Sequence, residues 1–311
     1  MTTERQIERA FLRGTRSITD QVVLSRLNDA LASGDYNAIL NAVDIEPAAF
    51  DEMRVLLTQA YAQAGQTELS RTRFDVPVRW NSANPRVEDY ARNVVGQHIT
   101  AITDDMRDAV RDTVADGYAF GRSVDRMALD IVGRMDGGTR KGGVVGLNQQ
   151  QAQWLANMRR LLRDNPKAAL RYGLRDKRFD SLLRRGDPLT ATQIDNISRQ
   201  YANKLLLSRG KMIARTERGA AINAGRMEAW QQAIDKTGID PSRIVKEWRH
   251  SSRMMYPRDA HVALHGDQVR GLYTPFTVNG FTCQYPHDPS LPASEVVNCG
   301  CQVVYKAARN G

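Results

Sequence analysis

The sequence lacks any uninterrupted apolar stretch of about 18 or more residues, so no membrane-spanning helix is expected. Its first residues, MTTERQIERAF, contain no basic segment followed by an apolar one and therefore do not resemble a secretory signal. Cysteine is scarce, with 3 cysteines in 311 residues, all of them late in the chain. That number does not make a disulfide framework, and folding in a reduced compartment is the simpler interpretation.

Common catalytic signatures are absent as well. The chain has no HExxH motif, no HNH-type order of residues and no nucleophile elbow. Its glycine-rich stretch at 133–147 contains neither GxxxxGK[ST] nor GxGxxG, because Lys141 is followed by Gly142. We therefore interpret this stretch as a flexible or tightly turning loop that does not bind a nucleotide.

Positive charge is in excess, with a net charge of +9, and much of it lies in one segment. Residues 158–185 contain ten lysines and arginines against three aspartates, which gives this segment +7. Such a block suggests contact with nucleic acid or another acidic surface, but it has only two aromatic residues, which disfavours base stacking. The alternatives are phosphate contact without sequence preference and a solvated helical face. The candidate contact residues are Arg159, Arg160, Arg175 and Arg178.

Apolar residues at three- and four-residue spacing predict helices through most of the chain before residue 241. The fold class expected is mainly α, with an elongated helical body followed by a small α+β C-terminal module. Three consecutive regions are predicted: an N-terminal helical region at 1–80, a central helical domain at 81–240, and a Cys/His-containing module at 241–311 that packs on the helix at 205–236.

One long helix is expected over about 192–236, where an apolar stripe recurs and after which Gly238 and Pro241 end the pattern. Thr216 and Asn223 interrupt the stripe one heptad apart. Such polar positions fix the register of a packed helix or bond a neighbouring backbone. We expect both side chains to be buried and hydrogen-bonded to the C-terminal module.

The C-terminal module contains seven of the chain's eight cysteines and histidines, and only His98 lies elsewhere. Zinc prefers these two residue types, so their crowding suggests a metal site. A strand is expected at 243–249, a short helix at 259–266 and a hairpin with Asn279-Gly280 as its turn. The seven residues are His250, His261, His265, Cys283, His287, Cys299 and Cys301.

Several short motifs, in this order and spacing, resemble the phage Mu F-like minor head protein family, also called phage head morphogenesis proteins. The resemblance covers roughly residues 130–305. The family commonly ends in AsnCysArgCys, and Gly300 replaces that arginine here. The motifs are Ile213-Ala214-Arg215-Thr216-Glu217 with Asn223 following, a strand ending at Trp248, Arg258-x-x-His261-x-x-Leu264-x-Gly266, Pro286-His287-Asp288-Pro289 and Asn298-Cys299-Gly300-Cys301.

The resemblance also implies a zinc module. Some family members have a CxxC pair at the positions of Arg258 and His261, and those members look like four-ligand zinc sites completed by the terminal CxC. An arginine cannot bind a metal, so a zinc site here needs a fourth ligand from Cys283, His287 or His265. The candidate metal ligands are His261, Cys283, His287, Cys299 and Cys301.

As a function, the resemblance implies a minor capsid or head-morphogenesis protein of a tailed phage or prophage, and no enzyme. The expected location is the virion, in the capsid interior or at the portal vertex, after assembly in the host cytoplasm. Expected partners are the portal protein, other capsid components and packaged DNA, and a role in DNA ejection is open. The alternative is a metal-dependent hydrolase or nuclease that uses the C-terminal His/Cys residues. A toxin-delivery domain is a third interpretation, disfavoured because no further domain follows Gly311.

Overall fold

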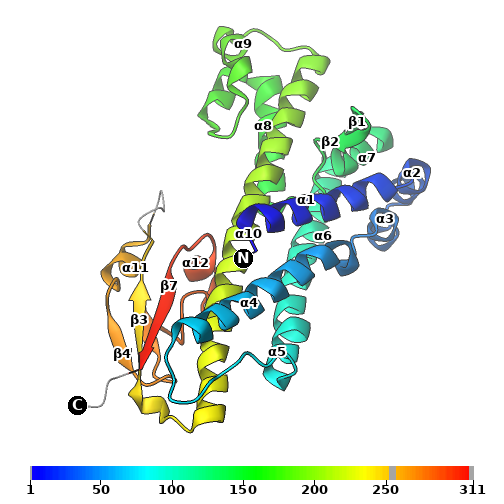
Figure 1. Cartoon of the computed structure of the whole chain (residues 1–311). Coiled ribbons are helices and arrows are strands. Elements are labelled where there is room, and N and C mark those ends of the chain that lie inside the picture. The colour runs from blue at the N-terminus through cyan, green and yellow to red at the C-terminus, as the bar shows by residue number, and fades with distance from the viewer. Residues whose placement is uncertain (1, 252–256, 308–311) are drawn as a thin grey trace. The chain divides into compact units, whose positions relative to one another are not determined.

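The computed structural model describes residues 2–251 and 257–307. Within these residues the protein is mainly α-helical and ends in a small module of antiparallel strands and short helices (Figure 1). The predicted fold class, a helical body followed by a small α+β module, is therefore confirmed.

Two compact units make up the chain, and each is assembled from separated stretches. One unit comprises Met1–Glu8, Met53–His98 and Lys211–Gly311, and the other comprises Arg9–Glu52 and Ile99–Gly210. The predicted consecutive regions 1–80, 81–240 and 241–311 do not coincide with these units. The reason is that segments far apart in the sequence pack together in each of them.

The unit around residues 99–210 is built from helices and one small hairpin. Asn148 begins helix α8 with a capping box, in which its side chain accepts from the Gln151 N–H and the Gln151 side chain accepts from the Asn148 N–H. The predicted loop at 133–147 contains a two-stranded hairpin, β1–β2. The elements are α1 (Glu4–Gln21), α2 (Leu24–Ser33), α3 (Tyr36–Val43), η1 (Pro47–Phe50), α6 (Val95–Ala119), α7 (Val124–Val132), β1 (Arg134–Asp136), β2 (Thr139–Lys141), α8 (Gln149–Asp164), η3 (Pro166–Arg171), η4 (Lys177–Phe179) and α9 (Asp180–Arg185).

The unit that contains the C-terminus combines helices with the strand module. The long helix predicted over 192–236 is present as α10 (Ala191–Thr237), and its residues from Lys211 onward belong to this unit. The stretch at 72–80 forms no strand and is a connector. The other elements are α4 (Asp51–Arg71), α5 (Pro85–Asp89), a π-helical turn (Tyr90–Val94), η5 (Pro241–Arg243), β3 (Ile244–Arg249), α11 (Asp259–Ala263), β4 (Gln268–Arg270), β5 (Phe276–Val278), β6 (Phe281–Cys283), α12 (Ala293–Val296) and β7 (Gln302–Ala307).

Strand β3 is the centre of a three-stranded antiparallel sheet with the order β4-β3-β7. Its alternate residues Ile244, Lys246 and Trp248 are fully buried, as the two-residue period of a strand dictates. Strands β5 and β6 form the predicted hairpin, and Asn279 and Gly280 both have positive φ, as a type I′ turn requires.

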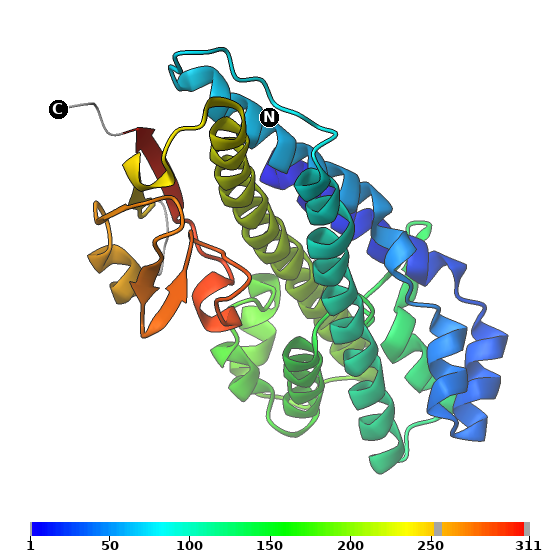
Figure 2. The same ribbon diagram turned by 90° about the horizontal axis from the view of Figure 1, so that it is seen from below.

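The core of the strand module includes side chains from α10. Met227 and Trp230 of that helix are buried in one apolar cluster with Trp248 of β3 and Val303 and Tyr305 of β7. Figures 1 and 2 show the module beside this part of α10. The predicted packing of the module on the helix at 205–236 is therefore confirmed.

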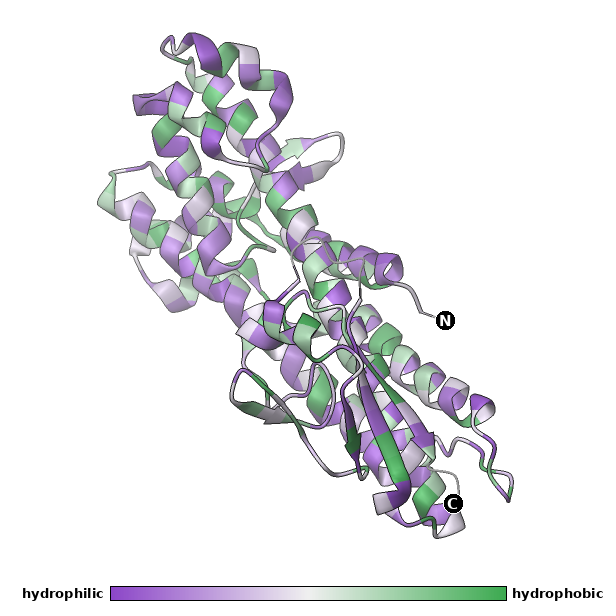
Figure 3. Cartoon of the chain, turned by 90° about the vertical axis from the view of Figure 1, so that its left-hand side faces the viewer, coloured by the Kyte–Doolittle hydropathy of each residue, from purple (hydrophilic) through white to green (hydrophobic). Residues whose placement is uncertain are grey.

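Hydrophilic and hydrophobic residues are mixed along the helices (Figure 3). Among the helices described, none has the length and apolar character needed to cross a bilayer.

Candidate metal centre

Asn223 joins helix α10 to the strand module and is completely buried. Its Nδ2 group donates to the carbonyl oxygen of Pro286 at 2.9 Å and lies 3.3 Å from the carbonyl oxygen of Cys301. Its Oδ1 atom accepts from the N–H of Val303 at 3.0 Å. One amide therefore bonds two segments of the module, which lie more than 60 residues away from it in the sequence.

A second connection lies two helical turns earlier on α10. The Thr216 hydroxyl accepts from the Asn298 N–H at 2.8 Å, and Arg215 donates to the Asn298 side-chain oxygen at 3.0 Å. Thr216 is 9% exposed. The expectation that Thr216 and Asn223 are buried and bonded to the C-terminal module is confirmed.

These bonds hold a turn that brings two cysteines together with a histidine. The Sγ atom of Cys299 lies 3.4 Å from Nδ1 of His261, and the Sγ atom of Cys301 lies 3.6 Å from the same nitrogen. All three side chains are buried, and their ligand atoms lie within 4.8 Å of one another. Two thiolates and an imidazole at these separations could hold a metal ion, and zinc prefers these donors.

The far nitrogen of His261 has its own buried partner. Its Nε2 atom lies 2.8 Å from Oε2 of Glu295 on α12, and Oε1 of that carboxylate accepts from Asn279 at 3.0 Å. A carboxylate that holds the second nitrogen fixes the tautomer and orientation of a metal-binding histidine. Trp248 packs edge-on against the His261 ring, with 5.5 Å between ring centroids.

Hydrogen bonding within the cluster shifts the pKa values of its two thiols in opposite directions. The hydrogen bond between the two thiols, together with His261, lowers the pKa of Cys299, and the same bond raises the pKa of Cys301, so Cys299 favours the thiolate and Cys301 the neutral thiol. Burial would lower the pKa of His261, but its hydrogen bonds to Cys299 and Glu295 raise it. A thiolate on Cys299 is the form that binds a metal.

The structure does not bring Cys283 and His287 into this cluster of ligand atoms. Both nitrogens of His287 are engaged, because Nε2 donates to the carbonyl oxygen of Cys299 at 3.0 Å and Nδ1 lies 3.3 Å from the Asn223 amide. Cys283 is buried in the apolar core, and burial raises its pKa to about 12, which keeps the thiol neutral. His287 thus supports the Cys299 backbone, and Cys283 fills the core.

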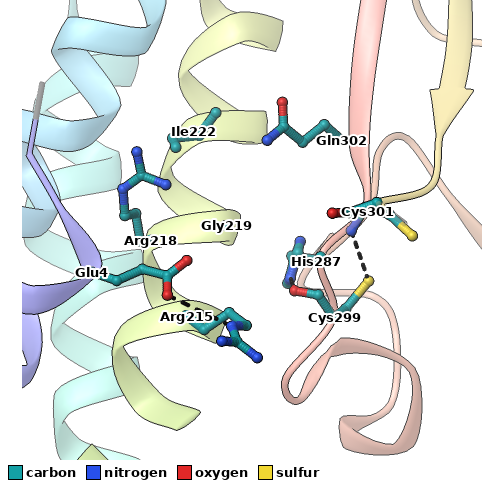
Figure 4. A pocket seen from close by; sticks show the side chains of 11 residues that line it. Glu4, Arg215, Arg218, Gly219, Ile222, His287, Cys299, Cys301 and Gln302 are labelled. Carbon is teal, nitrogen blue, oxygen red and sulfur yellow. Dashed lines mark hydrogen bonds and ion pairs between the residues drawn. The ribbon is translucent and has the colours of Figure 1, made fainter. Parts of the chain in front are cut away.

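A polar cavity of about 380 Å³ lies beside the cluster, between α10 and the Cys299–Gln302 segment (Figure 4). Arg215 and Arg218 border it from the helix, and Glu4 lies 3.6 Å from Arg215. Gly219 allows the helix to approach the site, since a Cβ atom there would lie 2.6 Å from the His287 ring.

The four candidate arginines of the basic segment lie in the other unit, and each has a partner there. Arg159 is 9% exposed and pairs with buried Asp130 at 3.0 Å, so it is not available for phosphate contact. Arg175 pairs with Asp180, whereas the Arg178 side chain pairs with Asp176 but remains 75% exposed. The fourth, Arg160, is exposed and donates to Asn157 at 3.2 Å.

Sequence reasoning missed the supporting residues of the site. Glu295 bonds His261, and Asn279 donates to Glu295, but neither residue belongs to a metal-ligand motif in the sequence. Glu217, a member of the IleAlaArgThrGlu motif, bonds His98 at 2.5 Å. Hydrogen bonding to Glu217 raises the pKa of His98.

The fold and the site define a mainly helical protein whose C-terminal module has a buried His/Cys cluster capable of holding a metal. No protein-family model matches the chain, and no solved structure matches it. A stretch of 96 residues, 30% of the chain, is 35% identical to the uncharacterized protein YqbB of Bacillus subtilis (strain 168). The match covers 29% of the length of that protein.

Proposed function

We propose that the chain is a minor capsid or head-morphogenesis protein of a tailed phage or prophage. In this role it is packaged in the procapsid near the portal vertex and contributes to head assembly. The observation that carries the proposal is that the motifs of the family resemblance, scattered over about 90 residues, meet in one hydrogen-bonded network. Thr216 bonds Asn298, Asn223 bonds Pro286 and Val303, and His287 bonds Cys299.

This convergence supports the resemblance because residues of separate motifs, Thr216, Asn223 and His287, make these contacts. Helix α10 supplies Thr216 and Asn223, and the module supplies the backbone groups that they bond. Chance matches to short motifs would have no reason to contact one another. The network makes the module a stable attachment on α10, which suits a protein that assembles with others in a particle.

The metal that we propose for the cluster of His261, Cys299 and Cys301 is zinc, in a structural role. Its contribution is to tie α11 to the turn that precedes β7. A structural zinc contributes its binding free energy to folding. The hydrolase alternative has no comparable observation among the described residues, where Glu295 bonds His261 and Asp288 accepts from the N–H groups of Gln284 and Ser290.

The test of this proposal is the composition of the particle. The chain should be found by mass spectrometry in purified virions and in procapsids assembled without DNA. A host strain that supplies only Asn223→Ala should yield particles with less of the chain, whereas Lys211→Ala, at an exposed position on the same helix, should be incorporated normally. Absence of the wild-type chain from both particles would refute the proposal.

A further inference from the structure

His250 lies beside the metal cluster, although neither its spacing nor the family resemblance selects it as a ligand. It follows the last residue of β3, and its Nδ1 atom is 3.6 Å from Sγ of Cys301. Its backbone N–H donates to Nδ1 of His265 at 3.1 Å. His265 thus uses that nitrogen to hold the backbone of His250.

The distance from His250 to Cys301 fits two ligands of one ion, but Nδ1 of His250 lies outside the group of His261, Cys299 and Cys301, whose ligand atoms are all within 4.8 Å of one another, so His250 must move toward that group to complete the site. A tetrahedral zinc with Zn–S bonds of about 2.3 Å and Zn–N bonds of about 2.0–2.1 Å places a sulfur and a nitrogen about 3.6 Å apart. The three nitrogen–sulfur distances here are 3.4, 3.6 and 3.6 Å. The Cys301 sulfur therefore lies at the distance expected for ligands of a shared ion from Nδ1 of His250 and from Nδ1 of His261.

The other candidates for a fourth ligand are engaged elsewhere. His287 uses both nitrogens, Cys283 is a neutral thiol in the apolar core, and Nδ1 of His265 accepts from His250. Arg258, at the position where some members of the resembled family have a cysteine, donates to the carbonyl oxygen of Val297 at 2.8 Å.

We propose that His250 is the fourth zinc ligand, through Nδ1, and completes a Cys2His2 site with His261, Cys299 and Cys301. The ligands then come from three segments: the end of β3, helix α11 and the turn before β7. A site with four protein ligands has no open position for a substrate, so this zinc is structural. His265 is a positioning residue that orients His250.

The direct test is X-ray absorption spectroscopy on the full wild-type chain loaded with zinc. The proposal expects two sulfur and two nitrogen neighbours of the imidazole type. Two sulfurs with one imidazole and a water oxygen would overturn the assignment of His250 and leave the three-residue site standing. Failure of the wild-type chain to bind zinc in excess would overturn both. This measurement needs no substitution and is decisive even if a variant does not fold.

Variants give an independent measure by zinc competition against a chromophoric chelator. His250→Ala should lower zinc affinity by more than the ~10–100-fold that loss of an outer-shell partner costs, whereas Glu295→Gln should stay within that range. His250→Cys should restore most of the affinity, because it again supplies a soft donor. Cys283→Ala, which removes a buried thiol outside the site, should leave the affinity unchanged.

Equal zinc affinity in His250→Ala and the wild-type chain would refute the proposal. The role in a virion is a separate matter: a chain with the expected zinc environment that is missing from particles would contradict only the proposed function.

Discussion

Replacement of Asn223 by alanine should destabilise the C-terminal module more than any other change of comparable size on α10. The alanine removes an amide that is completely buried and bonds Pro286 and Val303 at 2.9 and 3.0 Å. The carbonyl of Pro286 and the N–H of Val303 then lose their partner without gaining water. Each buried group left unsatisfied costs about 1–3 kcal/mol, so two such groups should lower the free energy of unfolding by about 2–6 kcal/mol.

The geometry also predicts the stability of a second variant at this position and of a control variant. Asn223→Asp keeps the oxygen that accepts from Val303 but cannot donate to Pro286, and it places a charge near the Cys301 carbonyl. It should therefore be no more stable than the alanine variant, because an unpaired buried charge is costly. Lys211→Ala, at an exposed position on the same helix, should change stability by less than about 0.5 kcal/mol.

Urea denaturation of the zinc-loaded proteins, followed by circular dichroism and by tryptophan fluorescence, measures these differences. The fluorescence transition should shift most, because Trp230 and Trp248 lie in the module's core. A loss below about 0.5 kcal/mol for Asn223→Ala would refute the reasoning, since it would mean that water or another side chain replaces both bonds.

Four further predictions follow from other interactions. Removal of zinc by a chelator should lower the melting temperature of the module, and Cys299→Ser should abolish that response; a melting curve that does not change on chelation would contradict a structural metal. Hydrogen bonding to Glu217 raises the pKa of His98 in the folded state. The stability that this pair adds to the fold should be complete below the unfolded pKa of about 6.5 and should fade as the pH rises through the folded pKa. His98→Gln should remove this pH dependence from denaturation measured at several pH values. Gly219→Ala should lower the free energy of unfolding by about 1–3 kcal/mol, because its Cβ would meet the His287 ring. Gly96→Ala, with open space at its Cβ, should be neutral or slightly stabilising. Equal changes in melting temperature for the two variants would argue against the close approach of Gly219 to His287. If the basic segment binds DNA, replacing the exposed Arg160 and Arg178 with glutamine should reduce the slope of log affinity against log salt concentration by up to about 0.9 for each duplex phosphate that is no longer neutralised. Arg159→Gln should chiefly reduce stability, because Arg159 pairs with Asp130. An unchanged slope for Arg160 and Arg178 would mark these two side chains as solvent-facing only.

The local features of the fold could be predicted from the sequence because they depend on neighbouring residues. The period of the apolar stripe predicted α10 almost to its ends, and Asn279-Gly280 predicted the turn of the β5–β6 hairpin. The polar positions Thr216 and Asn223 were identified in the same way, since a polar residue inside an apolar stripe needs a partner.

The site could be predicted only in part, because its closure depends on contacts between distant segments. Clustering of cysteine and histidine selected His261, Cys299 and Cys301, but it also selected Cys283 and His287. The structure separates these groups by hydrogen bonding and burial: both nitrogens of His287 are engaged, and Cys283 is a core residue. Composition does not contain that information.

The basic segment illustrates a related limit. A count of charges gives its net value but not the partner of each side chain. Arg159 looks like its neighbour Arg160 in the sequence, yet one is buried against Asp130 and the other is exposed. The ion pair between Arg159 of α8 and Asp130 of α7 distinguishes them.

The order of the strands in the sheet has a consequence for how the module forms during synthesis. Strand β3 lies between β4, made soon after it, and β7, the last strand of the described chain. Until β7 emerges, one side of β3 has unpaired backbone groups, and an unpaired edge is a template for association with other chains. The same late segment supplies the partners of Asn223 and two of the cluster's cysteines. A growing chain therefore carries an unfinished sheet until β7 is made, and the arrival of this segment closes the sheet, the helix contact and the metal cluster together.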